Sequence, residues 1–239
     1  MRKFNRKNHE LRKVSIEQNF NVNANGSCLI SMGDTKVICT ATFDEDLPPW
    51  LKNKESGWVT AEYGMLPGST SSRNKRESKQ GKQNGRTVEI QRLIGRSLRT
   101  IVDLKKIKGY QFIIDCDVIQ ADGGTRTASI NGGFVAMACA IKKLMKVGKL
   151  KENPINDFLS AVSCGIINNE TLLDLDYHED SNADTDANFV LTEKKGISEI
   201  QVSAEKNPFS LSNFNEMIEL SMAASKELFE IQKRAIEKS

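Results

Sequence analysis

The sequence has little cysteine and almost no histidine. Its five cysteines are odd in number, scattered, and never spaced as Cys-x-x-Cys, a pattern that argues against a disulfide framework and against a zinc site. We expect them to be reduced thiols in the core of a cytoplasmic protein. The two histidines, His9 and His178, stand in a basic and in an acidic segment, which disfavours a Ser-His-Asp triad.

Long apolar runs are also absent. The longest stretch without a polar side chain covers residues 132–141, about half of the roughly 20 residues that a membrane-spanning helix needs. No apolar segment follows the basic first seven residues, so we expect neither a secretory signal nor a membrane span. The motifs GxxxxGK[ST], GxGxxG, HExxH and GxSxG are missing as well, which removes several common enzyme classes.

The net charge is only +3, but the charges are unevenly distributed. Residues 1–13 carry six Lys or Arg and one acid, and residues 73–99 carry nine and two. Residues 171–193 carry seven acids and no Lys or Arg. Such blocks could hold a polyanion in one place and a metal ion or proton donor in another, or they could be solvated faces.

Strand and helix patterns alternate in both halves of the chain, which predicts an α+β fold of two related lobes, about 1–150 and 151–239, packed into one unit. Residues 67–85 are polar and basic and are expected to form a long exposed loop. The predicted strands cover 27–32, 35–43, 58–63, 111–120, 159–167, 172–177, 187–191 and 198–202. The predicted helices cover 86–103, the segment after 127 to about 145, and 211–235.

Two expected helix starts carry glycine and arginine. Gly123-Gly124-Thr125-Arg126-Thr127 stands between a predicted strand and a predicted helix, and Asn84-Gly85-Arg86-Thr87 repeats the arrangement. Open N–H groups, a hydroxyl and a guanidinium fork are the parts of a phosphate site. The alternatives are an ordinary capped helix start for the first segment and a surface arginine for the second.

Six acids crowd into the thirteen residues 174–186. Crowded carboxylates raise one another's pKa or bind a divalent cation, and either property suits phosphodiester chemistry. The alternative is a solvated acidic loop. Together, the three features fit an enzyme that cleaves a nucleic-acid backbone, and they leave open whether water or another nucleophile attacks.

At these residues the chain resembles the ribonuclease PH family, the phosphate-dependent 3′-exoribonucleases. The matching stretches follow the family's order over nearly the whole chain, and they are Gly33–Val37, Gly57–Pro67, Gly85–Arg96, Asp115–Ser129 and Asp176–Asp180. The resemblance implies the RNase PH fold with two similar βαβ-containing lobes. It also implies a homohexameric ring, a trimer of dimers.

The implied activity is trimming of the 3′ end of precursor tRNA by inorganic phosphate. Phosphate attacks the terminal phosphodiester and releases a nucleoside 5′-diphosphate, and the reverse reaction adds nucleotides. Inorganic phosphate is therefore an expected co-substrate, and a divalent cation such as Mg²⁺ is an expected cofactor.

The resemblance also assigns roles residue by residue. Arg86, Gly124, Thr125 and Arg126 match the phosphate-binding residues. Asp180 and Asp186 match the catalytic pair, which is linked to magnesium and to protonation of the leaving 3′ oxygen. Arg73 and Arg76 match basic loop residues linked to tRNA binding and subunit contacts. The chain departs from the family at Gly68, where an arginine is common, and at residues 201–205, in a predicted core strand.

Two other functions are compatible with parts of the pattern. A non-catalytic RNA-binding ring subunit would explain the basic blocks, but such subunits commonly lose the residues that Arg86, Arg126, Asp180 and Asp186 match. A magnesium-dependent hydrolytic exonuclease would explain the acidic cluster, but water as the nucleophile needs no phosphate cradle. Phosphorolysis therefore accounts for more of the sequence than either alternative.

Overall fold

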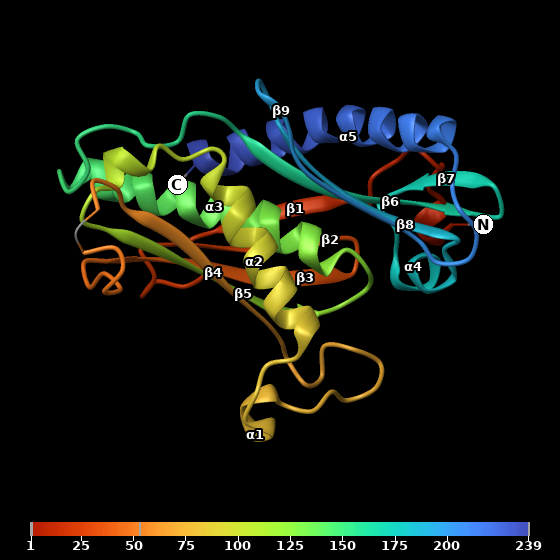
Figure 1. Ribbon diagram of the computed structural model, residues 1–239, viewed down its shortest axis with the longest axis horizontal. Coiled ribbons are helices and arrows are strands. Elements are labelled where there is room, and N and C mark those ends of the chain that lie inside the picture. Colours follow the sequence, from red (N-terminus) through yellow and green to blue (C-terminus); the bar gives the residue numbers. More distant parts are fainter. Residues whose placement is uncertain (1, 53, 239) are drawn as a thin grey trace.

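The first half of the chain forms a five-stranded sheet in the computed structural model, which describes residues 2–52 and 54–238 (Figure 1). Its strands are β1 (Val14–Gln18), β2 (Gly26–Met32), β3 (Thr35–Asp44), β4 (Trp58–Met65) and β5 (Gln111–Gln120). The order across the sheet is β1-β2-β3-β5-β4. Only β4 and β5 pair in parallel, and this pair requires a crossover connection.

Helix α2 (Gly85–Arg99) is that crossover, so β4, α2 and β5 form a βαβ unit. Its buried stripe includes Ile90, Ile94 and Leu98, as the helical spacing predicts. The helix ends at Arg99 rather than at the predicted residue 103. Ile101 and Val102 are still buried, and a 3-10 turn, Leu104–Ile107, follows.

The second half forms a four-stranded antiparallel sheet in the order β7-β6-β8-β9. Its strands are β6 (Leu159–Ile167), β7 (Glu170–Leu173), β8 (Thr185–Thr192) and β9 (Gly196–Ala204). Because β7 and β8 both run antiparallel to β6, they run parallel to each other. Strand β9 is one of the two edge strands and is half-exposed, so the prediction of a core strand there was wrong.

The predicted strand 172–177 is wrong at its carboxyl end. Strand β7 stops at Leu173, and Asp174 adopts a left-handed conformation with φ +55°. Helix α4 (Tyr177–Asn182) then begins with a capping box, in which Asp176 and Glu179 each accept a hydrogen bond from the other's backbone N–H. Two local devices, a left-handed residue and a capping box, outweigh the weak strand pattern.

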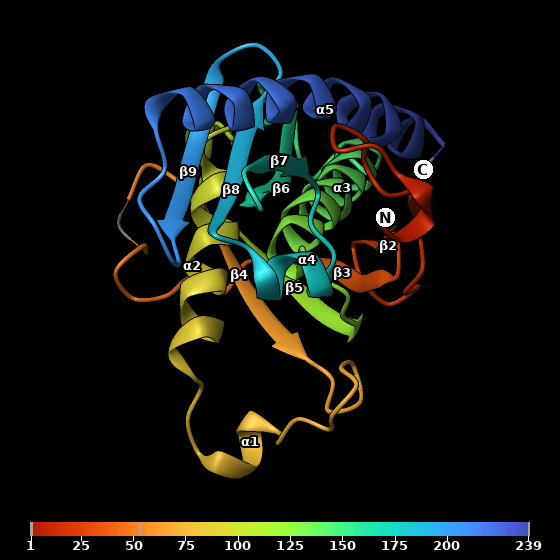
Figure 2. The same cartoon turned by 90° about the vertical axis from the view of Figure 1, so that its right-hand side faces the viewer.

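Helix α3 (Thr125–Lys146) lies between the two sheets and is buried on most of its surface (Figure 2). It packs on β2, β3 and β5 on one side and on β6 and α5 (Leu211–Glu237) on the other. Gly132 and Gly133 allow the close approach, because a Cβ on Gly132 would lie 2.6 Å from the Cys39 sulfur. All five cysteines are buried and none forms a disulfide bond among the described residues, which confirms their predicted place in the core.

Residues 66–84 project from the body of the protein and include only one short helix, α1 (Glu77–Gln80) (Figures 1 and 2). This confirms the predicted exposed loop except at its start, where Pro67 and Ser69 are buried against the body of the protein. Among the described residues, no helix is long and apolar enough to cross a membrane.

Candidate active site

A tight loop, residues 122–124, joins β5 to the start of α3. Gly123 and Gly124 both have positive φ, +73° and +63°, which a residue with a side chain adopts at a cost. No side chain caps the start of α3, so its first-turn N–H groups stay open to an anion. By contrast, the Asn84 side chain accepts a hydrogen bond from the Thr87 N–H at the start of α2.

The threonine hydroxyls beside this loop have partners within the protein. Tyr63 donates a hydrogen bond from its hydroxyl to Oγ1 of Thr125 over 2.9 Å, and Thr127 donates to the Gly124 carbonyl over 2.9 Å. Thr35 of β3 donates to the Gly123 carbonyl over 2.6 Å and accepts from the Asp122 N–H over 2.9 Å. These hydroxyls therefore hold the loop in place, and no side chain of the described residues caps the helix that begins at Thr125.

Gly123 brings the loop into contact with the segment before α4. A Cβ at this position would lie 2.5 Å from the Leu175 carbonyl oxygen and 2.8 Å from the Tyr177 nitrogen. We therefore expect Gly123→Ala to destabilise the protein by about 2–4 kcal/mol, through backbone strain and overpacking together. Urea unfolding measures this loss. Gly85→Ala is the matched control, since no atom lies within 4 Å of its Cβ, and an equal loss there would contradict the expectation.

Arg126 and Arg86 lie on two different helices and both influence the carboxylate of Asp180 electrostatically. Arg126 donates a hydrogen bond from Nη1 to Oε1 of Gln201 over 3.0 Å and lies 3.7 Å from Glu89. Arg86 is exposed, and its Nη1 lies 3.9 Å from the Met65 sulfur. Both guanidinium groups act on the charge of Asp180 and favour its ionised form. The structure thus brings together the two arginines that the sequence placed at separate helix starts.

Asp180 lies on α4 and Asp186 on β8. Burial raises the pKa of Asp180 above its usual value, although Arg126 and Arg86 oppose the shift. Burial, together with the negative charge of Asp180, raises the pKa of Asp186 to about 6. Glu205, just after β9, adds further repulsion on both carboxylates. One of these carboxyl groups can therefore hold a proton close to neutral pH.

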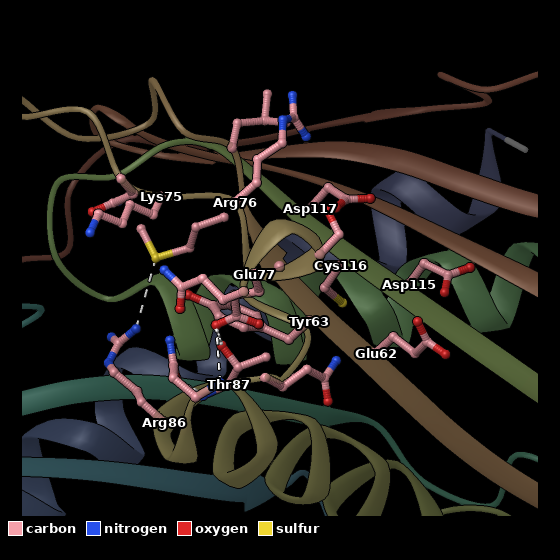
Figure 3. A pocket seen from close by; sticks show the side chains of 18 residues that line it. Glu62, Tyr63, Lys75, Arg76, Glu77, Arg86, Thr87, Asp115, Cys116 and Asp117 are labelled. Atoms are coloured by element: carbon pink, nitrogen blue, oxygen red, sulfur yellow. Dashed lines mark hydrogen bonds between the residues drawn. The ribbon is translucent and has the colours of Figure 1, made fainter.

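A cavity of about 790 Å³ lies between the projecting loop and the ends of β4 and β5 (Figure 3). Arg76 and Arg86 line it, together with Asp115 and Asp117. The cavity adjoins the cluster only through Arg86, because Arg126, Asp180 and Asp186 do not line it. Arg73 belongs to the same exposed loop and does not line the cavity either.

Three residues at the site were missed by the sequence analysis as site residues. Tyr63 and Thr35 hold the loop before α3, and Gln201 holds Arg126. Tyr63 and Thr35 lie in stretches that resemble the family. Their hydrogen-bond partners are far away in the sequence, so the sequence does not indicate them. Gln201 lies on the edge strand β9. It is 75 positions away from Arg126 in the sequence, and only the folded structure places the two side chains in contact.

The described residues contain no group of three or more His, Cys, Asp or Glu side chains arranged to hold a metal ion. Asp180 and Asp186 form a pair of carboxylates whose charges repel each other. A pair of this kind suits Mg²⁺, which is commonly held by one or two carboxylates together with substrate phosphate oxygens.

The fold and the charged cluster define a class of protein, the mixed α/β proteins in which two sheets enclose a helix and a carboxylate pair is influenced by an arginine at the start of that helix. Residues 10–143 match domain 1 of the 3′ exoribonuclease family, and residues 157–224 match domain 2. The chain belongs to this family. It is 55% identical over 226 residues to ribonuclease PH of Neisseria meningitidis serogroup C and of serogroup A, and the match covers 95% of this chain and 93% of each relative.

Solved structures of low identity share the fold. Rice (Oryza sativa) Rrp46 is 18% identical with a TM-score of 0.78, over 97% of this chain and 98% of that one. A chain of the Archaeoglobus fulgidus exosome with RNA bound to the active site is 22% identical with a TM-score of 0.77, over 94% and 90%. These likenesses confirm the predicted fold class.

Proposed function

We infer that the protein is a phosphorolytic 3′-5′ exoribonuclease that acts in tRNA processing, and that inorganic phosphate is its co-substrate. The observation that carries this inference is the uncapped start of α3, with its open N–H groups next to Arg126 and a carboxyl group able to hold a proton. Such a site can bind an anionic nucleophile and can also donate a proton to the leaving group. Membership of the 3′ exoribonuclease family and 55% identity to ribonucleases PH support the same conclusion.

We propose that phosphate binds to the backbone of Gly124 and Thr125 and to the side chains of Arg86 and Arg126. The open N–H groups and the two guanidinium groups would hold it in line with the last phosphodiester of the RNA. Most of the rate acceleration would come from this positioning and from stabilisation of charge on the transferring group.

Asp180 and Asp186 are proposed as the catalytic pair. A phosphate oxygen forms the new bond to phosphorus, and the bond from phosphorus to the 3′ oxygen of the shortened RNA breaks. The leaving 3′ oxygen takes a proton from the pair, and the nucleoside 5′-diphosphate departs. The raised pKa of Asp186, about 6, is what allows a carboxyl group to supply this proton near neutral pH.

The same pair is the proposed holder of Mg²⁺, because no larger group of ligands is present among the described residues. When bound, a magnesium ion would neutralise charge on the phosphate oxygens. Arg126 and Arg86 would then orient the phosphate, and Tyr63 and Thr35 would keep the loop at its position.

Arg73 and Arg76 are proposed to contact RNA beyond the last nucleotides. Both lie on the projecting loop, and contacts to phosphates make binding sensitive to salt. A homohexameric ring, a cytoplasmic location and a single domain of two lobes, about 1–150 and 151–239, remain proposals. A loop that projects this far from its own subunit is well placed to reach a neighbour.

The proposed function is tested with a precursor tRNA that carries a short 3′ trailer. With Mg²⁺ added, we expect the 3′ end to shorten and nucleoside 5′-diphosphates to be released only when inorganic phosphate is present. Chromatography of the released nucleotides measures this result. Adding nucleoside diphosphates in excess should lengthen the RNA. Nucleoside monophosphates released without phosphate would instead indicate hydrolysis, and bound but unaltered RNA would indicate a non-catalytic subunit.

A further inference from the structure

The N-terminal arm, residues 2–13, contains three arginines that are buried rather than solvated. The side chains of Arg2, Arg6 and Arg12 are 8%, 5% and 0% exposed. Their carboxylate partners, Glu179 and Asp174, lie in the second half of the chain, more than 160 positions away. These three arginines are therefore neither part of a solvated face nor a surface for a polyanion.

Arg12 fixes the phosphate loop. Its guanidinium group donates hydrogen bonds to the Asp122 and Gly123 carbonyls, directly before the start of α3. The same group forms an ion pair with the buried carboxylate of Asp174 at 2.7 Å. One end of the arm thus ties the loop that faces phosphate to the segment that leads into α4.

Arg2 fixes α4 itself. It donates to both carboxylate oxygens of Glu179, from Nε over 2.7 Å and from Nη2 over 2.9 Å. Arg6 adds a third hydrogen bond to Glu179 over 3.3 Å. A planar fork on a carboxylate fixes direction as well as distance, so the arm sets where α4 lies.

Glu179 carries this constraint to the catalytic pair, because it immediately precedes Asp180 in α4. Its Oε2 accepts a hydrogen bond from the Asp176 N–H over 3.0 Å, while Asp176 accepts from the Glu179 N–H over 2.9 Å. The backbone N–H of Asp180 in turn donates to the Asp176 carbonyl over 2.9 Å. Arg2 and the first turn of this six-residue helix therefore form one hydrogen-bonded unit.

We propose that Arg2 is a positioning residue for RNA phosphorolysis, and that it acts through Glu179 to hold the Asp180 carboxylate beside the phosphate loop. This inference rests on the proposed function. Arg2 touches neither Arg86 nor Arg126 in the contacts of the described residues. Its loss should therefore move Asp180 and leave the phosphate-binding groups in place.

The test compares Arg2→Gln and Arg2→Lys with the wild type, each with a native N-terminus and any tag at the other end. A displacement of about 1 Å in a catalytic group costs on the order of 100-fold, so we expect kcat of Arg2→Gln to fall about 10- to 100-fold. KM for inorganic phosphate should change less than about twofold. Arg2→Lys keeps the charge without the fork and should be intermediate. Lys7→Gln is the matched control, since Lys7 is an exposed residue of the same arm, and it should behave as wild type.

Amide hydrogen exchange separates positioning from activity. We expect the N–H groups of residues 179–183 to exchange faster in Arg2→Gln, with no change along α3. Wild-type kcat in Arg2→Gln, or a loss of kcat that only follows the unfolded fraction, would overturn the proposal. If the wild type released no diphosphate, the proposed function would be wrong. Unchanged amide exchange in α4 of Arg2→Gln would be a separate result, and it would overturn the positioning role of Arg2.

Discussion

Replacement of Asp186 by asparagine is expected to abolish RNA shortening and at the same time to stabilise the protein at pH 8. The activity should fall by at least about 100-fold, because an amide can neither hold a metal ion as a carboxylate does nor give a proton to the leaving oxygen. Asp180→Asn should behave alike. Near-normal activity of either variant, measured as diphosphate release, would contradict the assignment of the catalytic pair.

The gain in stability follows from the pKa of Asp186. Burial and the charge of Asp180 raise this pKa to about 6, from an ordinary value of 3.8. Below about pH 4 the carboxyl is protonated in the folded and in the unfolded state, so it costs nothing. Between about pH 4 and pH 6 the carboxyl ionises in the unfolded protein but stays protonated in the folded one, so stability falls over this range and stays low above pH 6.

Asparagine does not ionise, so the advantage of Asp186→Asn should be absent below about pH 4, grow between pH 4 and pH 6, and be complete above pH 6. We expect roughly 1–2 kcal/mol at pH 8, less than the full shift implies at about 1.4 kcal/mol per unit, since the site is partly solvated. Denaturant unfolding at several pH values, with EDTA present, measures this difference.

Asp184→Asn supplies the control for the stability measurement. The hydrogen bond from Lys206 lowers the pKa of Asp184, the opposite of the shift at Asp186. Its replacement should give no gain at any pH. A gain at Asp184 equal to that at Asp186 would mean that general charge, rather than burial at the site, is responsible.

Elements with a strong local pattern could be predicted from the sequence. Strand β5 alternates buried Phe112, Ile114 and Cys116 with less buried residues and has the predicted bounds. Helix α3 follows from its apolar run, although its burial on most sides depends on the second sheet. Local periodicity contains this information because each element repeats its own buried face.

Other features depend on partners far away along the chain. Strand β1 was not predicted, and it is the half-buried edge of the first sheet. The arginines of the N-terminal arm look like a solvated charge run until Asp174 and Glu179 are placed beside them. In the acidic segment, composition and spacing alone did not separate Asp174 and Glu179 from Asp180 and Asp186, and only the family resemblance selected the last two. In the structure, ion pairs with buried arginines mark the first two as structural.

Replacement of Arg126 by alanine is expected to give the largest loss in kcat/KM for inorganic phosphate. The side chain is only 19% exposed and is held by Gln201, so its guanidinium group needs little reorganisation to bind an anion. Removing one preorganised group that stabilises transferring charge costs about 100- to 1,000-fold. We expect a loss of that size in kcat/KM for inorganic phosphate, measured by diphosphate release at increasing phosphate concentration.

Arg126→Lys distinguishes the charge from the fork. Lysine keeps the positive charge that acts on Asp180, but it cannot donate two parallel hydrogen bonds to phosphate, so an intermediate loss is expected. Arg96→Ala controls for the general effect of removing one arginine, because Arg96 is exposed and stands near the opposite end of α2 from Arg86. Folding should survive in all three variants, since the partners of Arg126 lie near the surface. A normal KM for phosphate in Arg126→Ala would therefore remove the start of α3 from the mechanism, and the nucleophile would have to be bound elsewhere.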